Sequence, residues 1–370
     1  MKKIFTIIFI IFSIFYFYKI GETNYEKQKE IKKFIVSKPD FLPDKKSAAN
    51  TSFGFKNLKS DYYWLQTIQY IGGNALSSSY KSYLFLMIDL VTELNPYFSE
   101  PYVIGELLLP SYNPRYENLS EKKQEELKNQ AIEIGLKGVK NLCDLEKISK
   151  IEKETNLEKL FTEEKYKNPC KNSDVVYNLA FVYYFYKKDF KNAVKYYKVA
   201  SVTKGSPEGA KNLISILEGK GGNREKSFFM FLNMANYSSK GNEVCLEFSN
   251  ILQNIGERIF YDKIKINGNF LKDLEKTRKE NIFEDGNGLS ASSCGNFLNK
   301  SIRELNLYYL EEANKKYKEK FEKNSETPKD LLKNGFIDYI PVDYQQEENY
   351  GIIYFYNNEI GVYDYKMGKY

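Results

Sequence analysis

Two segments of the chain carry the same arrangement of small and large residues, 34 positions apart. The first copy is Ala193, Tyr197 and Ala200, and the second is Ser227, Phe231 and Met234. Residues at this spacing share one face of an α-helix. A small side chain there lets a neighbouring helix approach closely, and the large side chain fills the space beside it. The pattern therefore predicts helical hairpins that pack one after another along the chain.

Hydrophobic residues at helical spacing predict further helices on both sides of these copies. The predicted helices are residues 55–72, 82–94, 100–110, 121–142, 175–186, 190–201, 206–218, 224–235, 242–260 and 297–322. A softer copy of the pattern, Ala131, Gly135 and Gly138, lies on the fourth of them, and Gly105 is the small residue of the helix before it. Residues 143–172 are charged and indicate an exposed insertion with a short helix, and residues 284–296 indicate a polar gap.

The pattern resembles the tetratricopeptide repeat, whose second helix carries Ala, an aromatic and Ala at this spacing and which has the same period. The resemblance implies a mostly α fold, a solenoid of helical hairpins over residues 51–322. The chain departs from the repeat where Phe181 occupies the small position of a first helix, with Ala180 one residue early. It departs again where 62 residues separate Ala131 from Ala193. An ordinary amphipathic α-helical bundle remains the alternative.

Two further resemblances concern longer stretches. The segments GFKNLKSDYYWLQTIQYIG, LVTELNPYFSEPYVIGELLLP and AIEIGLKGVK resemble a group of bacterial envelope proteins with tetratricopeptide repeats, over residues 40–240. Residues 327–345 resemble a segment of type II secretion major pseudopilins, with Gly335, Pro341 and Asp343 at matching positions. Tyr344 and the two glutamines after it replace the Pro-aromatic-Gly that follows in that family, so its metal-assisted loop is not implied.

The C-terminal segment, residues 323–370, differs in kind from the helices before it. TPKDLLKNG predicts a short helix that ends at glycine, and GIIYFYNNEIGVYDY predicts a β-hairpin around Asn357 and Asn358. These signals indicate a small α+β module after the helical region.

The first twenty residues, MKKIFTIIFIIFSIFYFYKI, join a Lys2-Lys3 head to an apolar run. Residues 4–20 would span about 25 Å as a helix, which suits a thin bilayer. No small-x-small cleavage site follows, so the segment predicts an uncleaved signal anchor, and a cleaved signal peptide or a lipoprotein is the alternative. The anchor implies a single pass through the inner or cytoplasmic membrane, with the bulk of the chain extracytoplasmic. Residues 21–50 indicate a linker.

The amino-acid composition excludes several kinds of catalytic and metal site. The chain contains no histidine, which excludes Ser-His-Asp and Cys-His nucleophiles and histidine-bound zinc. The net charge of +6 comes from basic residues interleaved with acids, so we expect no nucleic-acid partner. We expect no enzyme activity, no cofactor and no metal. Trp64, the single tryptophan, is interpreted as a core anchor.

The four cysteines lack CxxC spacing, so they do not indicate a metal or redox motif. An extracytoplasmic location favours disulfides, and pairing by loop gives Cys143 with Cys170 and Cys245 with Cys294. Four reduced thiols are the alternative.

A tetratricopeptide-like solenoid would bind a protein or peptide partner along its first helices. Asn178 and Asn212 are 34 residues apart and share one repeat position, Tyr102 takes the equivalent place in the earlier unit, and Val182 and Tyr186 follow on the same helix face. These five residues are the predicted partner-binding row. The alternative is that Asn178 and Asn212 only solvate a helix or bridge neighbouring turns.

Two functions therefore remain open. The first is a non-enzymatic, membrane-tethered scaffold that binds a protein or peptide in an envelope assembly of pilus or secretion type. The second is an envelope enzyme that acts on glycan through a carboxylate, in the manner of a lytic transglycosylase. Glu106, on an otherwise apolar helix, is interpreted as a groove-edge or capping carboxylate.

Overall fold

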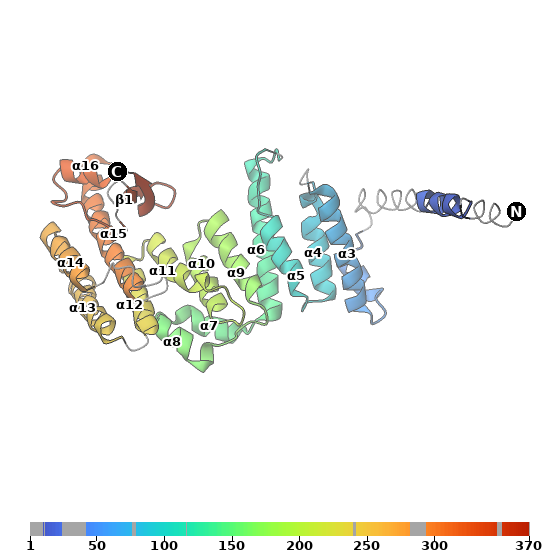
Figure 1. Cartoon of the computed structure of the whole chain (residues 1–370), viewed down its shortest axis with the longest axis horizontal. Coiled ribbons are helices and arrows are strands. Elements are labelled where there is room, and N and C mark those ends of the chain that lie inside the picture. The colour runs from blue at the N-terminus through green and yellow to red at the C-terminus, as the bar shows by residue number, and fades with distance from the viewer. Residues whose placement is uncertain are drawn as a thin grey trace. The chain divides into compact units, whose positions relative to one another are not determined.

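The structure is a computed structural model that describes residues 10, 12–23, 42–75, 79–115, 117–239, 242–281, 294–345 and 350–369. Within these ranges the fold is mostly α-helical, with a two-stranded antiparallel sheet near the C-terminus (Figure 1). The predicted fold class is confirmed at this level. The chain divides into two compact units, Met1–Asn141 and Leu142–Tyr370, and each is described by itself.

The first unit contains α2 (Lys45–Asn50), α3 (Lys56–Asn74), α4 (Lys81–Leu94), α5 (Ser99–Leu108) and most of α6 (Glu121–Leu142). Helix α4 packs against α2, α3 and α5, and its Leu84, Ile88 and Val91 are 0% exposed. A Cβ atom at Gly105 would lie 3.0 Å from Ile134 and 3.1 Å from Ile88. The small residue that the sequence places in α5 therefore permits a close approach of helices.

The linker prediction covers residues 21–50, but the last six of these form α2. Asp44 caps this helix, because its Oδ2 accepts hydrogen bonds from the backbone N–H groups of Lys46 and Ser47 at 3.1 and 3.2 Å. Residues 24–41 lie outside the described ranges.

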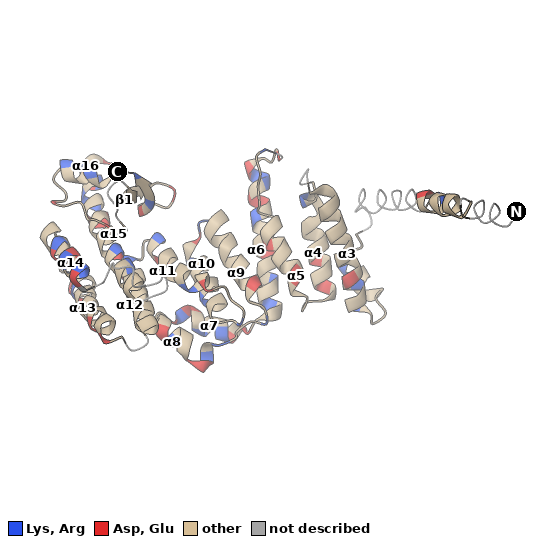
Figure 2. Ribbon diagram, in the orientation of Figure 1, with Lys and Arg blue, Asp and Glu red and all other residues tan. Residues whose placement is uncertain are grey.

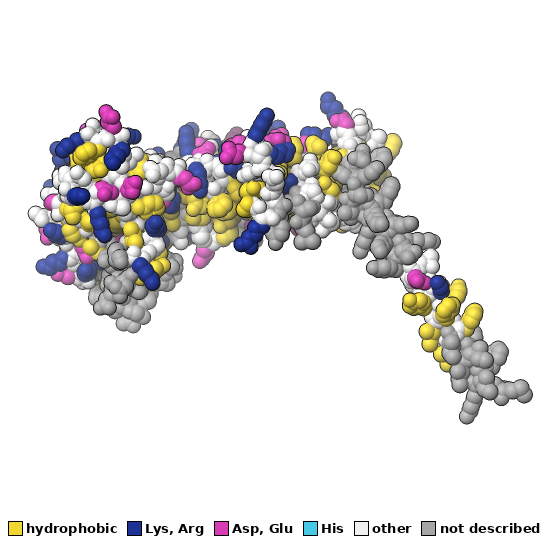
Figure 3. All heavy atoms as spheres, turned by 90° about the horizontal axis from the view of Figure 1, so that it is seen from above, with side chains coloured by type: hydrophobic (Ala, Val, Ile, Leu, Met, Phe, Trp, Pro, Cys, Tyr) yellow, Lys and Arg dark blue, Asp and Glu magenta, His cyan; other side chains and the backbone are white. Residues whose placement is uncertain are grey.

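Residues 12–23 are helical and expose large apolar side chains; Phe12, Phe15 and Phe17 are 69%, 62% and 70% exposed (Figure 3). In the described part of the chain, no helix combines the length and the apolar character that a membrane span requires. Residues 4–9 and 11 of the predicted anchor lie outside that part. The anchor therefore stays a prediction.

The outer face of α3 is apolar. Leu58, Tyr62 and Leu65 stand at positions i, i+4 and i+7 and are 68%, 58% and 62% exposed. Residues 62–80 contain no charged side chain. Trp64 is half-buried and meets a phenylalanine ring edge-to-face, with the ring centroids 5.7 Å apart.

The second unit begins with α7 (Leu145–Lys153), α8 (Leu157–Thr162), the 3₁₀ turn η1 (Glu164–Tyr166), α9 (Ser173–Phe181), the π-helical turn η2 (Val182–Tyr186), α10 (Phe190–Ser201), α11 (Gly209–Lys220) and α12 (Arg224–Ser239). Helix α10 packs between α9 and α11, and α11 packs on α12 (Figure 1). Consecutive helices are therefore neighbours in space, as the hairpin pattern predicts.

The residues of the repeated pattern are buried at these contacts. Ala193, Tyr197 and Ala200 of α10 are at most 1% exposed, and the corresponding residues of α12 are at most 3% exposed. Tyr197 meets Tyr177 of α9 edge-to-face, with the ring centroids 5.3 Å apart. The aromatic of the pattern therefore fills the gap between paired helices.

The first helix of this hairpin contains an irregular turn. Residues 182–186 wind as a π-helix, in which the N–H of Lys187 donates to the carbonyl of Val182 at 3.3 Å. A π-helical turn accommodates one extra residue in a helix. This accounts for the offset of Ala180, which is fully buried one position early, while Phe181 is partly exposed.

The prediction of an exposed insertion over residues 143–172 is wrong. The segment folds into α7, α8 and η1, with Ile148, Ile151, Leu157 and Leu160 at most 5% exposed. Helix α7 packs on α10 and α8 packs on α12. Basic and acidic residues are interspersed along α7 and α8 (Figure 2). Two short amphipathic helices therefore bury a narrow apolar stripe that the charges obscure in the sequence.

The rest of the unit comprises α13 (Glu243–Phe260), α14 (Gly268–Asn281), α15 (Cys294–Phe321), α16 (Pro328–Lys333) and the strands β1 (Tyr350–Asn357) and β2 (Val362–Lys369). The strands pair with Phe355 opposite Asp364, and Gly361 takes φ +75° in the turn between them. Gly335 follows α16 with φ +72°. The predicted short helix with its glycine stop and the predicted hairpin are both confirmed.

A buried arginine joins this hairpin to the helices. Arg224 of α12 donates from Nη1 to Glu304 at 3.0 Å, from Nε to Glu311 at 2.9 Å, and from Nη2 to the carbonyl of Tyr363 in β2. Burial alone would lower the pKa of Arg224, but Glu304 and Glu311 hold it above its usual range. Arg224 is therefore charged, and its charge is matched by residues that come much later in the chain.

A second arginine fixes the segment before the hairpin. Arg303 of α15 makes a two-pronged ion pair with Asp343, at 2.7 and 2.8 Å, and Tyr354 donates to the same carboxylate at 2.8 Å. The guanidinium lies 4.7 Å from the ring centroid of Tyr344 and 4.2 Å from that of Tyr365. A hairpin alone is only marginally stable, and these contacts anchor it to α15.

Candidate functional site: a groove along α12

The predicted partner-binding row does not form one surface. Tyr102 and Val182 are 0% exposed. The hydroxyl of Tyr102 donates to the carbonyl of Pro96 at 3.1 Å and accepts from Asn141 at 2.9 Å. Both side chains belong to the interior, so neither can line an open face in this structure.

The other three predicted residues lie in the second unit and are half-buried. Asn178 is on α9 and Asn212 is on α11, the two helices that flank α10, and Tyr186 ends η2. The Oδ1 atom of Asn212 is buried and accepts no hydrogen bond among the described residues. A partner-binding role for Asn178 and Asn212 stays a prediction, but the row no longer includes Tyr102 or Val182.

Glu106 is neither a groove-edge nor a capping carboxylate. Its side chain is 1% exposed, and among the described residues neither carboxylate oxygen has a hydrogen-bond partner. Burial raises the pKa of this carboxyl well above its usual value. Because the folded state holds the proton more tightly than the unfolded state, the free energy of unfolding falls as the pH rises above the ordinary glutamate pKa.

Replacing Glu106 with Gln keeps the shape of the side chain and removes this titration. We expect the variant to match the wild type at acidic pH and to become progressively more stable than it as the pH rises, by at most about 1.4 kcal/mol per pH unit. Urea unfolding followed by the fluorescence of Trp64, in the same unit, measures the difference. The exposed Glu100 of the same helix gives the control Glu100→Gln, and a difference that does not change with pH would contradict the assignment.

A groove in the second unit consists of two cavities that share Lys226 of α12. The first cavity has a volume of 240 Å³ and is lined by Glu152, Phe190, Lys191, Val194, Lys195, Lys198, Leu217, Glu218, Gly221, Asn223 and Lys226. The second has a volume of 350 Å³ and is lined by Thr155, Asn156, Glu225, Lys226, Phe229, Met230, Asn233, Gln253 and Tyr261. We call the two together the α12 groove. The segment from Glu152 to Asn156 borders both.

The first cavity is cationic. Lys191, Lys195 and Lys198 stand at i, i+4 and i+7 on α10, so they share the helix face opposite the one that packs on α9. Lys195 pairs with Glu152 at 2.7 Å. Neither Lys191 nor Lys226 has a carboxylate at ion-pair distance among the described residues. We name this space the lysine cavity.

Lys198 lies at the buried side of the lysine cavity and is 3% exposed. Its ammonium donates to the backbone carbonyl of Glu154 at 2.8 Å. Burial lowers the pKa of Lys198, the nearby Glu218 raises it, and the positive charge of Lys226 lowers it further. Positive charge is therefore concentrated here beyond what the protein itself neutralises.

The second cavity brings together three side-chain amides with unused hydrogen-bonding groups. Asn156 Oδ1 accepts from the N–H of Lys159 and Asn233 Oδ1 accepts from the N–H of Leu157, both at 3.0 Å. These bonds fix the orientation of each amide and leave both NH₂ groups as donors. Gln253 is oriented the other way, because its Nε2 donates to a glutamate at 2.7 Å. Its oxygen is therefore an acceptor, and we name this space the amide cavity.

An aromatic pair borders the amide cavity. Phe229 of α12 and Tyr261, just after α13, lie nearly parallel, with ring centroids 5.6 Å apart and planes inclined by 14°. Tyr261 is 60% exposed. A large aromatic surface beside unused amide donors and an acceptor suits a ligand that carries both apolar groups and peptide-like polar groups.

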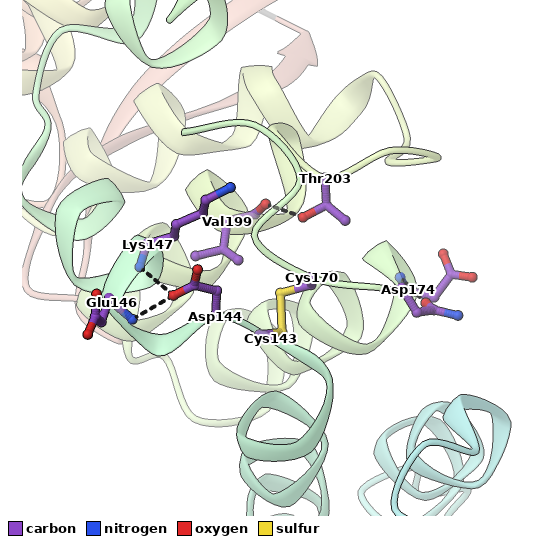
Figure 4. Close-up of a disulfide and its surroundings, with 9 residues drawn as sticks. Cys143, Asp144, Glu146, Lys147, Cys170, Asp174, Val199 and Thr203 are labelled. Carbon is purple, nitrogen blue, oxygen red and sulfur yellow. Dashed lines mark hydrogen bonds between the residues drawn. A yellow bond between two sulfur atoms is a disulfide. The ribbon is translucent and has the colours of Figure 1, made fainter. Parts of the chain in front are cut away.

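A disulfide braces the wall of the groove. Cys143 bonds to Cys170, and the enclosed segment contains both Glu152 and Asn156 (Figure 4). Next to the disulfide, Asp144 Oδ1 caps α7 by accepting from two backbone N–H groups at 3.0 Å (Figure 4). The second disulfide joins Cys245 to Cys294, so both bridges are those that loop pairing indicates.

The carboxylate of Asp343 is engaged by neighbouring side chains of the protein. It is occupied by Arg303 and Tyr354, as described above, and in the ranges that the structure describes no three acidic or cysteine side chains gather as metal ligands. Through these contacts Asp343 fixes the segment before the hairpin against α15.

Comparison of the chain with protein-family models, with curated proteins and with solved structures finds no match. A functional conclusion must therefore come from the fold and from the α12 groove.

Proposed function

We propose that this chain is a non-enzymatic scaffold of the bacterial cell envelope, tethered by its N-terminal apolar segment, whose α12 groove binds an extended segment of a partner protein. The observation that carries the proposal is the amide cavity, where two donors and an acceptor flank an aromatic pair whose Tyr261 ring is exposed. Extended peptides present alternating N–H and C=O groups that such a set can satisfy, while an apolar side chain rests on the aromatic rings.

The helical architecture supports a scaffold built of tetratricopeptide-like repeats. Helices α9 to α12 pack in chain order, and the two copies of the small-and-aromatic pattern are buried at equivalent places. Repeats of this kind expose long surfaces whose side chains can change without affecting the buried pattern. In the α12 groove, exposed side chains of α10 and α12, the second helices of the hairpins, supply part of the lining.

Two observations support the cellular location. The disulfides Cys143–Cys170 and Cys245–Cys294 persist where the environment is oxidising, which fits an extracytoplasmic location. The exposed aromatic residues of the helix 12–23 fit burial in a membrane. We propose an assembly of pilus or secretion type as an example of the envelope machine to which the partner belongs.

The alternative function, a glycan enzyme that uses a carboxylate, would need an acid that a substrate can reach. Glu106 has the raised pKa that a general acid requires, but it is 1% exposed. No observation at this residue favours the alternative, so the scaffold is the function we propose.

The groove can be tested with a library of random peptides displayed on phage and selected on the full-length protein in detergent. We expect the selected peptides to lose about tenfold in affinity on Tyr261→Ala, because they lose the exposed half of the aromatic pair. Tyr237→Ala is the matched control, since Tyr237 is 38% exposed on α12 and does not line the groove. Peptides that bind both variants as they bind the wild type would place the binding surface elsewhere.

A further inference from the structure

We infer that the lysine cavity binds a carboxylate side chain, so that the segment held in the α12 groove is acidic. The inference rests on the proposed function in that it assigns the charge of the same bound segment. It is carried by the lining of the cavity, where four lysines face two glutamates and leave a formal excess of two positive charges.

The unneutralised charges belong to identifiable side chains. Lys195 is paired with Glu152 at 2.7 Å, and Glu218 accepts a hydrogen bond from Asn223 at 2.9 Å. Lys191 and Lys226 are exposed lysines on opposite helices, α10 and α12, that line the same cavity. An anion that enters between them would be attracted to both, and the attraction grows as water leaves the cavity.

Lys198, at the buried side of the lysine cavity, provides a further hydrogen-bond donor for an anion. Its ammonium has three N–H groups, and the backbone carbonyls of Glu154 and Glu152 lie 2.8 and 3.5 Å from it. At least one N–H therefore remains for a ligand. A buried ammonium is stabilised by a nearby anion, so a carboxylate in the cavity would offset the cost of keeping Lys198 charged.

The lining selects a carboxylate over a phosphate. Phe190, Val194 and Leu217 supply apolar surface for the methylene groups that precede a side-chain carboxylate. The volume of 240 Å³ accommodates a side chain rather than a large headgroup.

The connection to the amide cavity identifies the carrier of the carboxylate as a peptide. Because Lys226 lines both cavities, an extended ligand held at the lysines can also contact Asn156 and Asn233, whose NH₂ groups match peptide carbonyls. The predicted ligand is thus an extended segment with an Asp or Glu a few residues from an apolar or aromatic side chain.

Fluorescence anisotropy with labelled synthetic peptides tests the inference on the full-length protein. One probe contains Glu, Tyr and Gly, and a second has Gln in place of every Glu. We expect the Glu peptide to bind about tenfold more tightly than the Gln peptide at low salt, and to lose that advantage when salt is raised. In Lys191→Gln/Lys226→Gln the advantage should disappear, while the exposed Lys204 provides the control Lys204→Gln.

The charge-reversed variant Lys191→Glu/Lys226→Glu distinguishes a changed site from a protein that fails to fold. A folded variant should prefer the same peptide with Lys in place of Glu. Equal binding of the Glu and Gln peptides, with both weakened by Tyr261→Ala, would overturn the carboxylate inference and leave the proposed function intact. Binding of neither peptide would overturn both. Phosphatidylglycerol vesicles or inorganic phosphate that displace the Glu peptide in proportion to their charge would instead identify a phosphate site.

Discussion

Replacing Arg224 with alanine is expected to lower the free energy of unfolding of the second unit by about 3–5 kcal/mol, because the buried Glu304 and the half-buried Glu311 then lose their common partner. Arg224 and Glu304 have side chains only 3% and 4% exposed, so water cannot substitute for the lost bonds. The carbonyl of Tyr363 in β2 also loses its side-chain donor. Urea unfolding followed by far-UV circular dichroism measures the loss.

Hydrogen exchange detected by mass spectrometry shows where Arg224→Ala destabilises the unit. Peptides from α12, α15 and β2 should lose protection together. Arg258→Ala, at an exposed arginine of α13, is the control and should change little. A triple variant with Met at 224 and Gln at 304 and 311 removes all three charges and should recover much of the stability. An Arg224→Ala protein as stable as the control would show that the ion pairs do not hold the hairpin.

Loss of both disulfides is expected to destabilise the chain by about 3–4 kcal/mol for each bridge in the chain-entropy model. Cys143–Cys170 closes a separation of 27 residues and Cys245–Cys294 one of 49 residues, so the second should contribute slightly more. Paired Cys→Ser variants and treatment with a reductant should lower the midpoint of thermal unfolding by similar amounts. Each variant keeps the chain otherwise unchanged.

Alkylation of intact cells without a reductant provides the complementary measurement. We expect no modified cysteine, because all four are paired and the extracytoplasmic location that we propose is oxidising. Four alkylated cysteines would indicate a reducing compartment and would contradict both the bridges and the extracytoplasmic location.

The helices with a continuous apolar face were predictable from the sequence. The prediction for residues 190–201 has the same bounds as α10, because Asp189 caps its first turn and the buried Ala193, Tyr197 and Ala200 mark one side. Ser206 was predicted to cap the next helix, with Pro207 in its first turn. Helix α11 starts instead at Gly209, because Pro207 lies in a turn in which its carbonyl accepts from the N–H of Ala210 at 3.0 Å. Local capping signals locate a helix well and its first residue less well.

Two helical regions were missed or misjudged for a common reason. Residues 143–172 and α14 are rich in charge, and each buries only a narrow stripe, represented in α14 by Leu271 and Leu274. A short apolar stripe of this kind stabilises the fold only when another helix covers it. Its burial depends on tertiary contacts that the local pattern does not contain.

Only part of the candidate site could be predicted from the sequence. The lysine stripe Lys191, Lys195 and Lys198 has helical spacing and could have been read as one face of α10. The amide cavity could not, because Asn156, Asn233 and Gln253 come from three separate elements. The predicted row of first-helix residues failed at Tyr102 and Val182, since the repeat register does not distinguish a groove-facing position from one covered by the next helix.

The distance in sequence between Arg224 and its partners sets an order of events as the chain is made. Glu304 follows Arg224 by 80 residues and Tyr363 by 139, while Asp364 follows its partner Lys220 by 144. A chain that emerges from its N-terminus can pack α9 to α12 early, but it must keep Arg224 hydrated until its partners arrive. Synthesis that stops before β2 therefore leaves Arg224 paired with Glu304 and Glu311 but without the carbonyl of Tyr363, and it leaves Lys220 without Asp364.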